Sequence, residues 1–133
     1  MNRLKKPKVS LPVPVEQEEM ENLFEWAGLS AGKHPELNDM FHIPNGGWRS
    51  KREAGLFKQA GVKPGVPDIC LPVPRGGYNG LYIEMKRTRG SHTSDDQKAW
   101  VEKLNHYGYY AVICKGWISA SEVILSYLSL TES

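Results

Sequence analysis

Residues Pro67–Lys86 read PDICLPVPRGGYNGLYIEMK, and this stretch decides the fold that the sequence predicts. Both of its ends are apolar and rich in β-branched or aromatic residues, so we expect one strand over residues 69–73 and a second over residues 81–86. Between them, residues 74–80 contain three glycines and a proline, which are residues that favour tight turns. The stretch therefore predicts a β-hairpin.

Three chemically active side chains meet at one end of this predicted hairpin. Because side chains alternate faces along a strand, Glu84 and Lys86 point the same way, while Met85 points into the core. The hairpin also returns Asp68, just before the first strand, to the neighbourhood of Glu84 and Lys86. Two carboxylates suit Mg²⁺ or Mn²⁺. A lysine beside them stays protonated, so we expect Lys86 to position a water molecule or stabilise transition-state charge.

The same residues have a plain structural interpretation. A glutamate and a lysine two positions apart on a strand commonly form a solvated ion pair, and an aspartate after a proline is commonly part of a turn or a cap. From these residues alone, a metal site and a solvated strand face both stay open.

Further blocks of sequence bear on this choice. In chain order they are Asn45-Gly46-Gly47-x-Arg49, Gly61-Val62-Lys63-Pro64-Gly65-Val66-Pro67-Asp68-Ile69, Gly80-Leu81-Tyr82-Ile83-Glu84-Met85-Lys86, Ser94-x-x-Gln97 and Gly108-Tyr109. With these blocks in this order, the chain resembles the VRR-NUC family, a branch of the PD-(D/E)xK nuclease superfamily, and in particular its stand-alone phage-type members. The resemblance spans roughly residues 16–128. It implies an α/β, restriction-endonuclease-like core with a mixed central sheet flanked by helices.

The resemblance also implies roles for individual residues. Those with a catalytic role would be Asp68, Glu84, Lys86 and Gln97. The metal ligands would be Asp68, Glu84, the carbonyl of Met85 and a glutamate of the first helix, where Glu16 fits the spacing best although Glu18, Glu19 and Glu21 crowd the same segment. Gln97 has a structural reason as well, because Ser94-x-x-Gln97 forms a capping box.

The activity that the resemblance implies is hydrolysis of DNA phosphodiester bonds by an endonuclease that depends on Mg²⁺ or Mn²⁺. It further suggests a homodimer that is specific for branched DNA such as four-way junctions. Two alternatives stay open: a catalytically silent DNA-binding or assembly module, and a nuclease subunit that needs a helicase partner. The presence of Asp68, Glu84 and Lys86 together speaks against the silent module.

Basic and glycine-rich residues are candidates for contact with the nucleic acid. Backbone amides of a tight turn at residues 45–47 can approach a phosphate closely. A helix predicted over residues 51–60 has a basic face, and two arginines follow the second strand of the hairpin. A solvated basic surface is the alternative for each. The candidate contacts are Asn45, Gly46, Arg49, Lys51, Arg52, Arg87 and Arg89.

The rest of the chain predicts one nuclease-like domain over residues 15–133, preceded by a basic, proline-rich arm over residues 1–14. An amphipathic helix is expected over residues 15–30. The capping box at Ser94 opens a helix that continues to Tyr107. The continuously apolar run over residues 109–114 predicts an interior strand. Ser119 is expected to open the last helix.

Composition sets the remaining bounds. A chain of 133 residues is long enough for one core, and its net charge of +2 is too small to favour a strong, nonspecific coat on DNA. No apolar run reaches the length of a membrane span. Cys70 and Cys114 both fall in predicted strands and suit free thiols in a reducing compartment. We therefore expect a cytoplasmic protein, in the host cytoplasm if it is encoded by a phage.

Overall fold

The computed structural model describes residues 13–44 and 50–132. Most of the expected N-terminal arm lies outside these ranges, as do Asn45, Gly46 and Arg49. The helices are α1 (Glu16–Ser30), α2 (Lys51–Gln59), α3 (Asp95–His106) and α4 (Trp117–Leu128), with one 3₁₀ helix, η1 (Pro35–Asp39). The strands are β1 (Phe41–His42), β2 (Ile69–Leu71), β3 (Leu81–Lys86) and β4 (Tyr110–Lys115).

The four strands form one mixed sheet in the order β1-β2-β3-β4. Strands β2 and β3 are antiparallel and pair Ile69 with Ile83, which confirms the predicted hairpin. Strand β1 adds antiparallel to β2, and β4 adds parallel to β3. The expected α/β architecture is thereby confirmed for the described residues.

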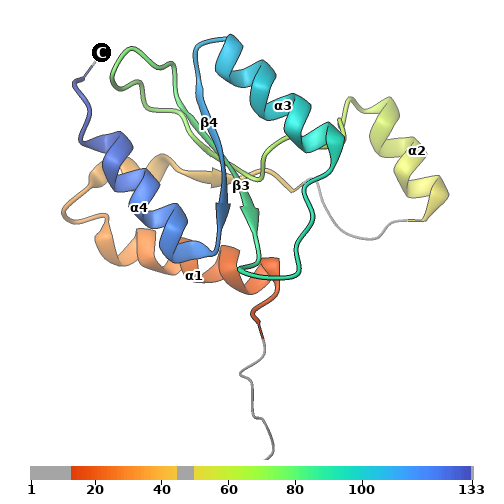
Figure 1. The fold of residues 1–133 in the computed structure, drawn as a ribbon, viewed down its shortest axis with the longest axis horizontal. Coiled ribbons are helices and arrows are strands. Elements are labelled where there is room, and N and C mark those ends of the chain that lie inside the picture. The colour runs from red at the N-terminus through yellow and green to blue at the C-terminus, as the bar shows by residue number, and fades with distance from the viewer. Residues whose placement is uncertain (1–12, 45–49, 133) are drawn as a thin grey trace, which may run out of the picture.

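Alternation along β3 separates a core face from a second face. Leu81, Ile83 and Met85 are fully buried on the face covered by α1 and α4, where they meet Leu23 and Ile124. Helix α3 packs against β4 from the other side of the sheet (Figure 1). Glu84 and Lys86 point to the α3 side, and we call this side the site face.

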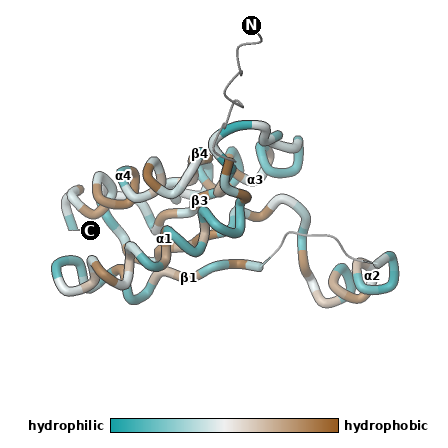
Figure 2. Tube along the Cα trace, turned by 90° about the horizontal axis from the view of Figure 1, so that it is seen from below, coloured by the Kyte–Doolittle hydropathy of each residue, from teal (hydrophilic) through white to brown (hydrophobic). Residues whose placement is uncertain are grey.

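Helix α2 stands apart from the rest of the domain in both views (Figures 1 and 2). It begins where the sequence predicts, because the Ser50 hydroxyl accepts a hydrogen bond from the Glu53 amide, 3.1 Å away. Its residues are all exposed. In the described part of the chain, no helix is both long and apolar enough to cross a membrane.

Two strands differ from the sequence-based expectation. Strand β2 ends at Leu71 instead of continuing to residue 73, because Pro72 has no amide hydrogen to continue the ladder. Strand β4 lies at the edge of the described sheet and not in its interior. Its apolar sequence has another cause, since α3 and α4 cover its two faces.

The last helix begins at Trp117, two residues earlier than expected, because Glu19 of α1 caps it. Glu19 is only 3% exposed, and its carboxylate accepts a hydrogen bond from the Trp117 amide at 3.2 Å. The residue ahead of the helix is Gly116, which has φ of 87° and no side chain with which to cap. A Cβ at Gly116 would lie 2.8 Å from Thr88 Cγ2 and 3.4 Å from Glu19 Oε2, so the close approach requires glycine. The first turn of α4 contains no acidic residue, and Glu19 supplies the missing negative charge.

Replacing Glu19 with alanine is expected to destabilise the fold by about 1–2 kcal/mol, because it removes the cap of α4 and leaves the Trp117 amide without this acceptor. Thermal or urea unfolding would measure the change. Glu18→Ala is the matched control, since Glu18 lies in the same turn of α1 but is exposed. Equal stability of the two variants would contradict this account of how α4 begins.

Candidate active site

Two carboxyl groups lie opposite each other where β2 and β3 meet. The pairing of Ile69 with Ile83 places Asp68 across from Glu84. Asp68 is half-buried, and its Oδ2 accepts a hydrogen bond from the Met85 amide at 2.9 Å. Glu84 is only 2% exposed. The hairpin therefore holds two acidic groups together at a site that excludes most water.

Burial, the negative charge of Asp68 and a hydrogen bond to Asp68 together raise the pKa of Glu84 to about 9, and burial is the largest cause. Lys86 opposes the shift, while the charge of Glu16 adds to it. At neutral pH and without a cation, the pair therefore holds a proton that an isolated carboxylate would release. A divalent cation would remove the repulsion that causes the shift, so the donor set fits such an ion.

The protein side chains would fill only part of the coordination sphere of this ion. Within residues 13–44 and 50–132, no group of three or more His, Cys, Asp or Glu side chains is arranged to hold a metal. Mg²⁺ keeps several waters and uses one or two carboxylates together with substrate phosphates. A two-carboxylate site suits that mode of binding.

Lys86 is held in place from the side of α3. Its Nζ donates hydrogen bonds to Gln97 Oε1 at 2.8 Å and to the His92 carbonyl at 2.9 Å, and it lies 3.7 Å from Glu84 Oε2. Lys86 as a whole is 4% exposed. Both short contacts are to acceptors, so Lys86 Nζ is the donor in each of them.

Gln97 connects this lysine to the carboxylate pair and to the start of α3. Its Oε1 accepts from the Ser94 amide as well as from Lys86, and its Nε2 donates to Glu84 Oε2 at 3.2 Å. The Ser94 hydroxyl accepts from the Gln97 amide, which completes the expected capping box. The structural and the site-facing interpretations of Gln97 are thus compatible, because one side chain makes both sets of contacts.

The loop that leads into Asp68 is also seated against α3. Gly65 has φ of 87°, and a Cβ there would lie 2.5 Å from the Asp96 carbonyl carbon. A side chain would push the loop away from the helix, so glycine is required at this position. The first turn of α3 therefore supports Asp68 through the loop and supports Lys86 through Gln97.

The glutamates of α1 separate into different positions. Glu16, the favoured candidate, is exposed at the start of α1 and close enough to raise the pKa of Glu84. Glu18 and Glu21 are exposed, and Glu19 caps α4. Of the four, Glu16 is the one whose charge acts on Glu84.

The described candidates for nucleic-acid contact do not all lie beside Glu84. Arg87 points away from Lys86, and its Nη2 lies 3.5 Å from the Val13 carbonyl ahead of α1. Arg89 is exposed on the loop between β3 and α3. Lys51 and Arg52 are exposed on α2, which stands apart from the sheet (Figure 1).

Two histidine contacts were not predicted from the sequence. His42 Nδ1 lies 3.0 Å from the Asp68 carbonyl, which only accepts, so this nitrogen carries the proton. The His92 carbonyl accepts from Lys86. Neither contact had a signal in the sequence, because both use a main-chain carbonyl that any residue possesses.

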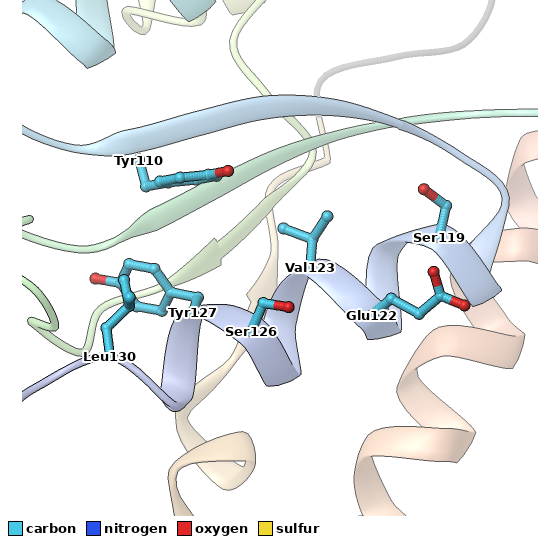
Figure 3. Close-up of a pocket in the computed structure, with 7 residues that line it drawn as sticks. All are labelled: Tyr110, Ser119, Glu122, Val123, Ser126, Tyr127 and Leu130. Carbon is cyan, nitrogen blue, oxygen red and sulfur yellow. The ribbon is translucent and has the colours of Figure 1, made fainter.

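A pocket of about 380 Å³ lies elsewhere, between β4 and α4 (Figure 3). Its lining residues are Tyr110, Ser119, Glu122, Val123, Ser126, Tyr127 and Leu130. Tyr110 alternates with Ala111 and therefore lies on the core side of β4, away from the site face. The pocket is not part of the arrangement around Asp68 and Glu84.

Comparison with known proteins identifies relatives of this domain. The sequence profile of the VRR-NUC domain matches residues 16–117. A solved structure described as a VRR-NUC domain protein superposes with a TM-score of 0.80 and is 33% identical in sequence. The match covers 92% of this chain and 94% of the other. No curated protein gives a significant match.

Glu84→Gln is expected to stabilise the metal-free protein at neutral pH, because glutamine is already neutral, whereas Glu84 must take up a proton when the chain folds. The folded pKa of Glu84 lies above that of the unfolded chain, so the folded state binds more protons between pH 4.5 and pH 9. Wild-type stability should fall as pH rises through this window, and the variant should escape that loss.

The advantage of Glu84→Gln at pH 8 in chelator should be at least about 1 kcal/mol, or roughly 4 °C in Tm. It should shrink toward pH 5. Glu102→Gln, an exposed change on α3, is the control. If Glu84→Gln were no more stable than wild type at any pH, the unfavourable interaction assigned to Glu84 and Asp68 would be contradicted.

Proposed function

This chain belongs to the VRR-NUC family of nucleases, and on that basis we propose that it is a metal-dependent DNA endonuclease that hydrolyses phosphodiester bonds. The observation that carries the proposal is the buried pair of Asp68 and Glu84, with the Lys86 ammonium beside it. Chance placement of an Asp, a Glu and a Lys on a strand would leave them solvated. Here Glu84 and Lys86 are buried, and Asp68 contacts Glu84.

Asp68 and Glu84 would hold Mg²⁺ or Mn²⁺, with the Met85 carbonyl and Glu16 as further candidate ligands. When bound, such an ion neutralises charge on the scissile phosphate and lowers the pKa of a water molecule. Asp68 is preorganised for this task, because the Met85 amide fixes one of its carboxylate oxygens at 2.9 Å. Gln97 orients Glu84 in the same way through its Nε2.

Lys86 would stabilise the negative charge that develops on the phosphate or orient the attacking water. Two of its donors are used by Gln97 and His92, and these contacts fix the ammonium without neutralising it. A fixed positive charge in a site that excludes water stabilises a transition state more than a solvated one does, because no reorganisation is needed.

We further propose that the substrate is branched DNA, such as a four-way junction, and that the protein acts as a homodimer. The branched substrate rests on the resemblance to the family, and the dimer is supported by the protruding helix α2, on which Leu56 is 55% exposed and Phe57 40% exposed. A second copy would cover this apolar surface. Two sites related by a two-fold axis would then cut two strands symmetrically. Lys51, Arg52, Arg87 and Arg89, with Asn45, Gly46 and Arg49 outside the described ranges, stay candidates for contact with the DNA backbone.

The nuclease proposal predicts that Asp68→Asn, Glu84→Gln and Lys86→Met each reduce cleavage at least about 100-fold, because each removes a charge from the reacting centre. Cleavage of a labelled four-way junction with Mn²⁺ would be followed on gels, with flap, splayed-arm and plain duplex DNA in parallel. Chelator should stop the reaction.

Glu102→Gln and Lys98→Met are matched controls, because both residues are exposed on α3. These variants should cut like wild type. Full activity in Glu84→Gln, with wild type active beside it, would end the proposal.

A further inference from the structure

Aromatic side chains lie on the site face next to the carboxylate pair. Phe41 of β1 pairs with Cys70 of β2, and Cys70 pairs with Tyr82 of β3. Directly paired residues place their side chains on the same face of a sheet. Tyr82 precedes Glu84 by two positions, so all three share the face of Glu84.

We call these residues, together with Tyr109, the aromatic shelf. Phe41 is 47% exposed at the outer edge. Tyr82 is half-buried and braced by Tyr109, with ring centroids 5.2 Å apart and an edge-to-face angle of 78°. Cys70 is buried between Phe41 and Tyr82 and hydrogen-bonds to Tyr82. The shelf is thus uncharged. It presents the exposed ring of Phe41 and the half-buried ring of Tyr82, which Tyr109 contacts.

The shelf is continuous with the proposed catalytic centre. Two residues along a strand span about 7 Å, so Cys70 and Tyr82 lie one such step from Asp68 and Glu84 on the same face. This step is comparable to the spacing of neighbouring nucleotides along an extended strand. A phosphate held at the carboxylate pair would therefore place a flanking nucleotide over the shelf.

The chemistry of the shelf selects the base of that nucleotide and not its phosphate. Aromatic side chains bind nucleobases by stacking, whatever the sequence, because every base has a π-face. Inside a duplex the base is stacked on its neighbours and is not available to a protein ring. An unpaired or unstacked base at a branch point is available.

We infer that the aromatic shelf of Phe41 and Tyr82 stacks an unpaired nucleobase that flanks the scissile phosphodiester, and that the substrate class is DNA with unstacked nucleotides at the cut. This inference rests on the proposed nuclease function and deepens it. It gives a physical reason for preferring branched DNA to plain duplex. The alternative is that Phe41 packs against a second copy of the chain, and the test below distinguishes the two.

The test compares Phe41→Ala with wild type on two labelled splayed-arm substrates in Mn²⁺. One substrate is intact, and the other has abasic residues on both sides of the cleavage position. Phe41→Ala should slow cutting of the intact substrate about tenfold, which corresponds to the loss of one stacked base. On the abasic substrate, where no base can stack, the two proteins should cut alike.

Two further variants make this comparison specific. Phe41→Tyr keeps the ring and should restore wild-type cutting. Leu29→Ala removes an apolar side chain from α1 that is 83% exposed, and it should change nothing. Equal slowing by Phe41→Ala on intact and abasic DNA would overturn the inference. The inference would also be overturned if the wild type had the mass of a dimer and Phe41→Ala that of a monomer, because Phe41 would then belong to a protein interface.

A binding measurement separates failure of the shelf from failure of the nuclease proposal. A splayed-arm oligonucleotide with 2-aminopurine at the unpaired flanking position reports stacking by a loss of fluorescence. Wild type should quench it in chelator, without cleavage, and Phe41→Ala should not. If wild type cuts DNA but Phe41→Ala quenches equally, the shelf inference fails alone. If wild type quenches but never cuts in Mn²⁺, the shelf stands and the proposed activity fails.

Discussion

The defining constraint of this structure is that the carboxyl groups of Asp68 and Glu84 are held next to each other, although their negative charges repel. The hairpin of β2 and β3 brings them together, and burial removes the water that would otherwise separate their charges. A globular fold gains nothing from such a contact, since like charges in a buried site cost free energy. The arrangement makes physical sense once a cation is shared between the two groups. Functional sites often contain such arrangements, which lower the stability of the folded protein.

The rest of the domain holds these two groups in place. On one face, Leu81, Ile83 and Met85 anchor β3 into the core beneath α1 and α4. On the other face, the first turn of α3 contacts Lys86 and Glu84 through Gln97, and contacts the loop before Asp68 at Gly65. A single strand thus connects an apolar core to a polar site because its side chains alternate. Both faces of β3 are thus in contact with helices.

Local sequence signals predicted much of this fold. Strand β3 has the predicted bounds, and α1, α2 and α3 begin within a residue of where capping residues or periodicity place them. The grouping of Asp68, Glu84, Lys86 and Gln97 followed from alternation, from the hairpin and from the resemblance to a family. The start of α4 could not be predicted in this way, because its cap, Glu19, lies 98 residues away in sequence. The edge position of β4 was hidden for a similar reason, since helices on both faces make an edge strand as apolar as an interior one.

The most direct measurement of the central claim is a calorimetric titration of Mn²⁺ into the metal-free protein and into Glu84→Gln. The account predicts saturable binding to the wild type, because a cation relieves the repulsion between Asp68 and Glu84, and affinity at least about tenfold weaker in the variant. Heats no larger than dilution in the wild type, or equal affinity in the two proteins, would contradict it.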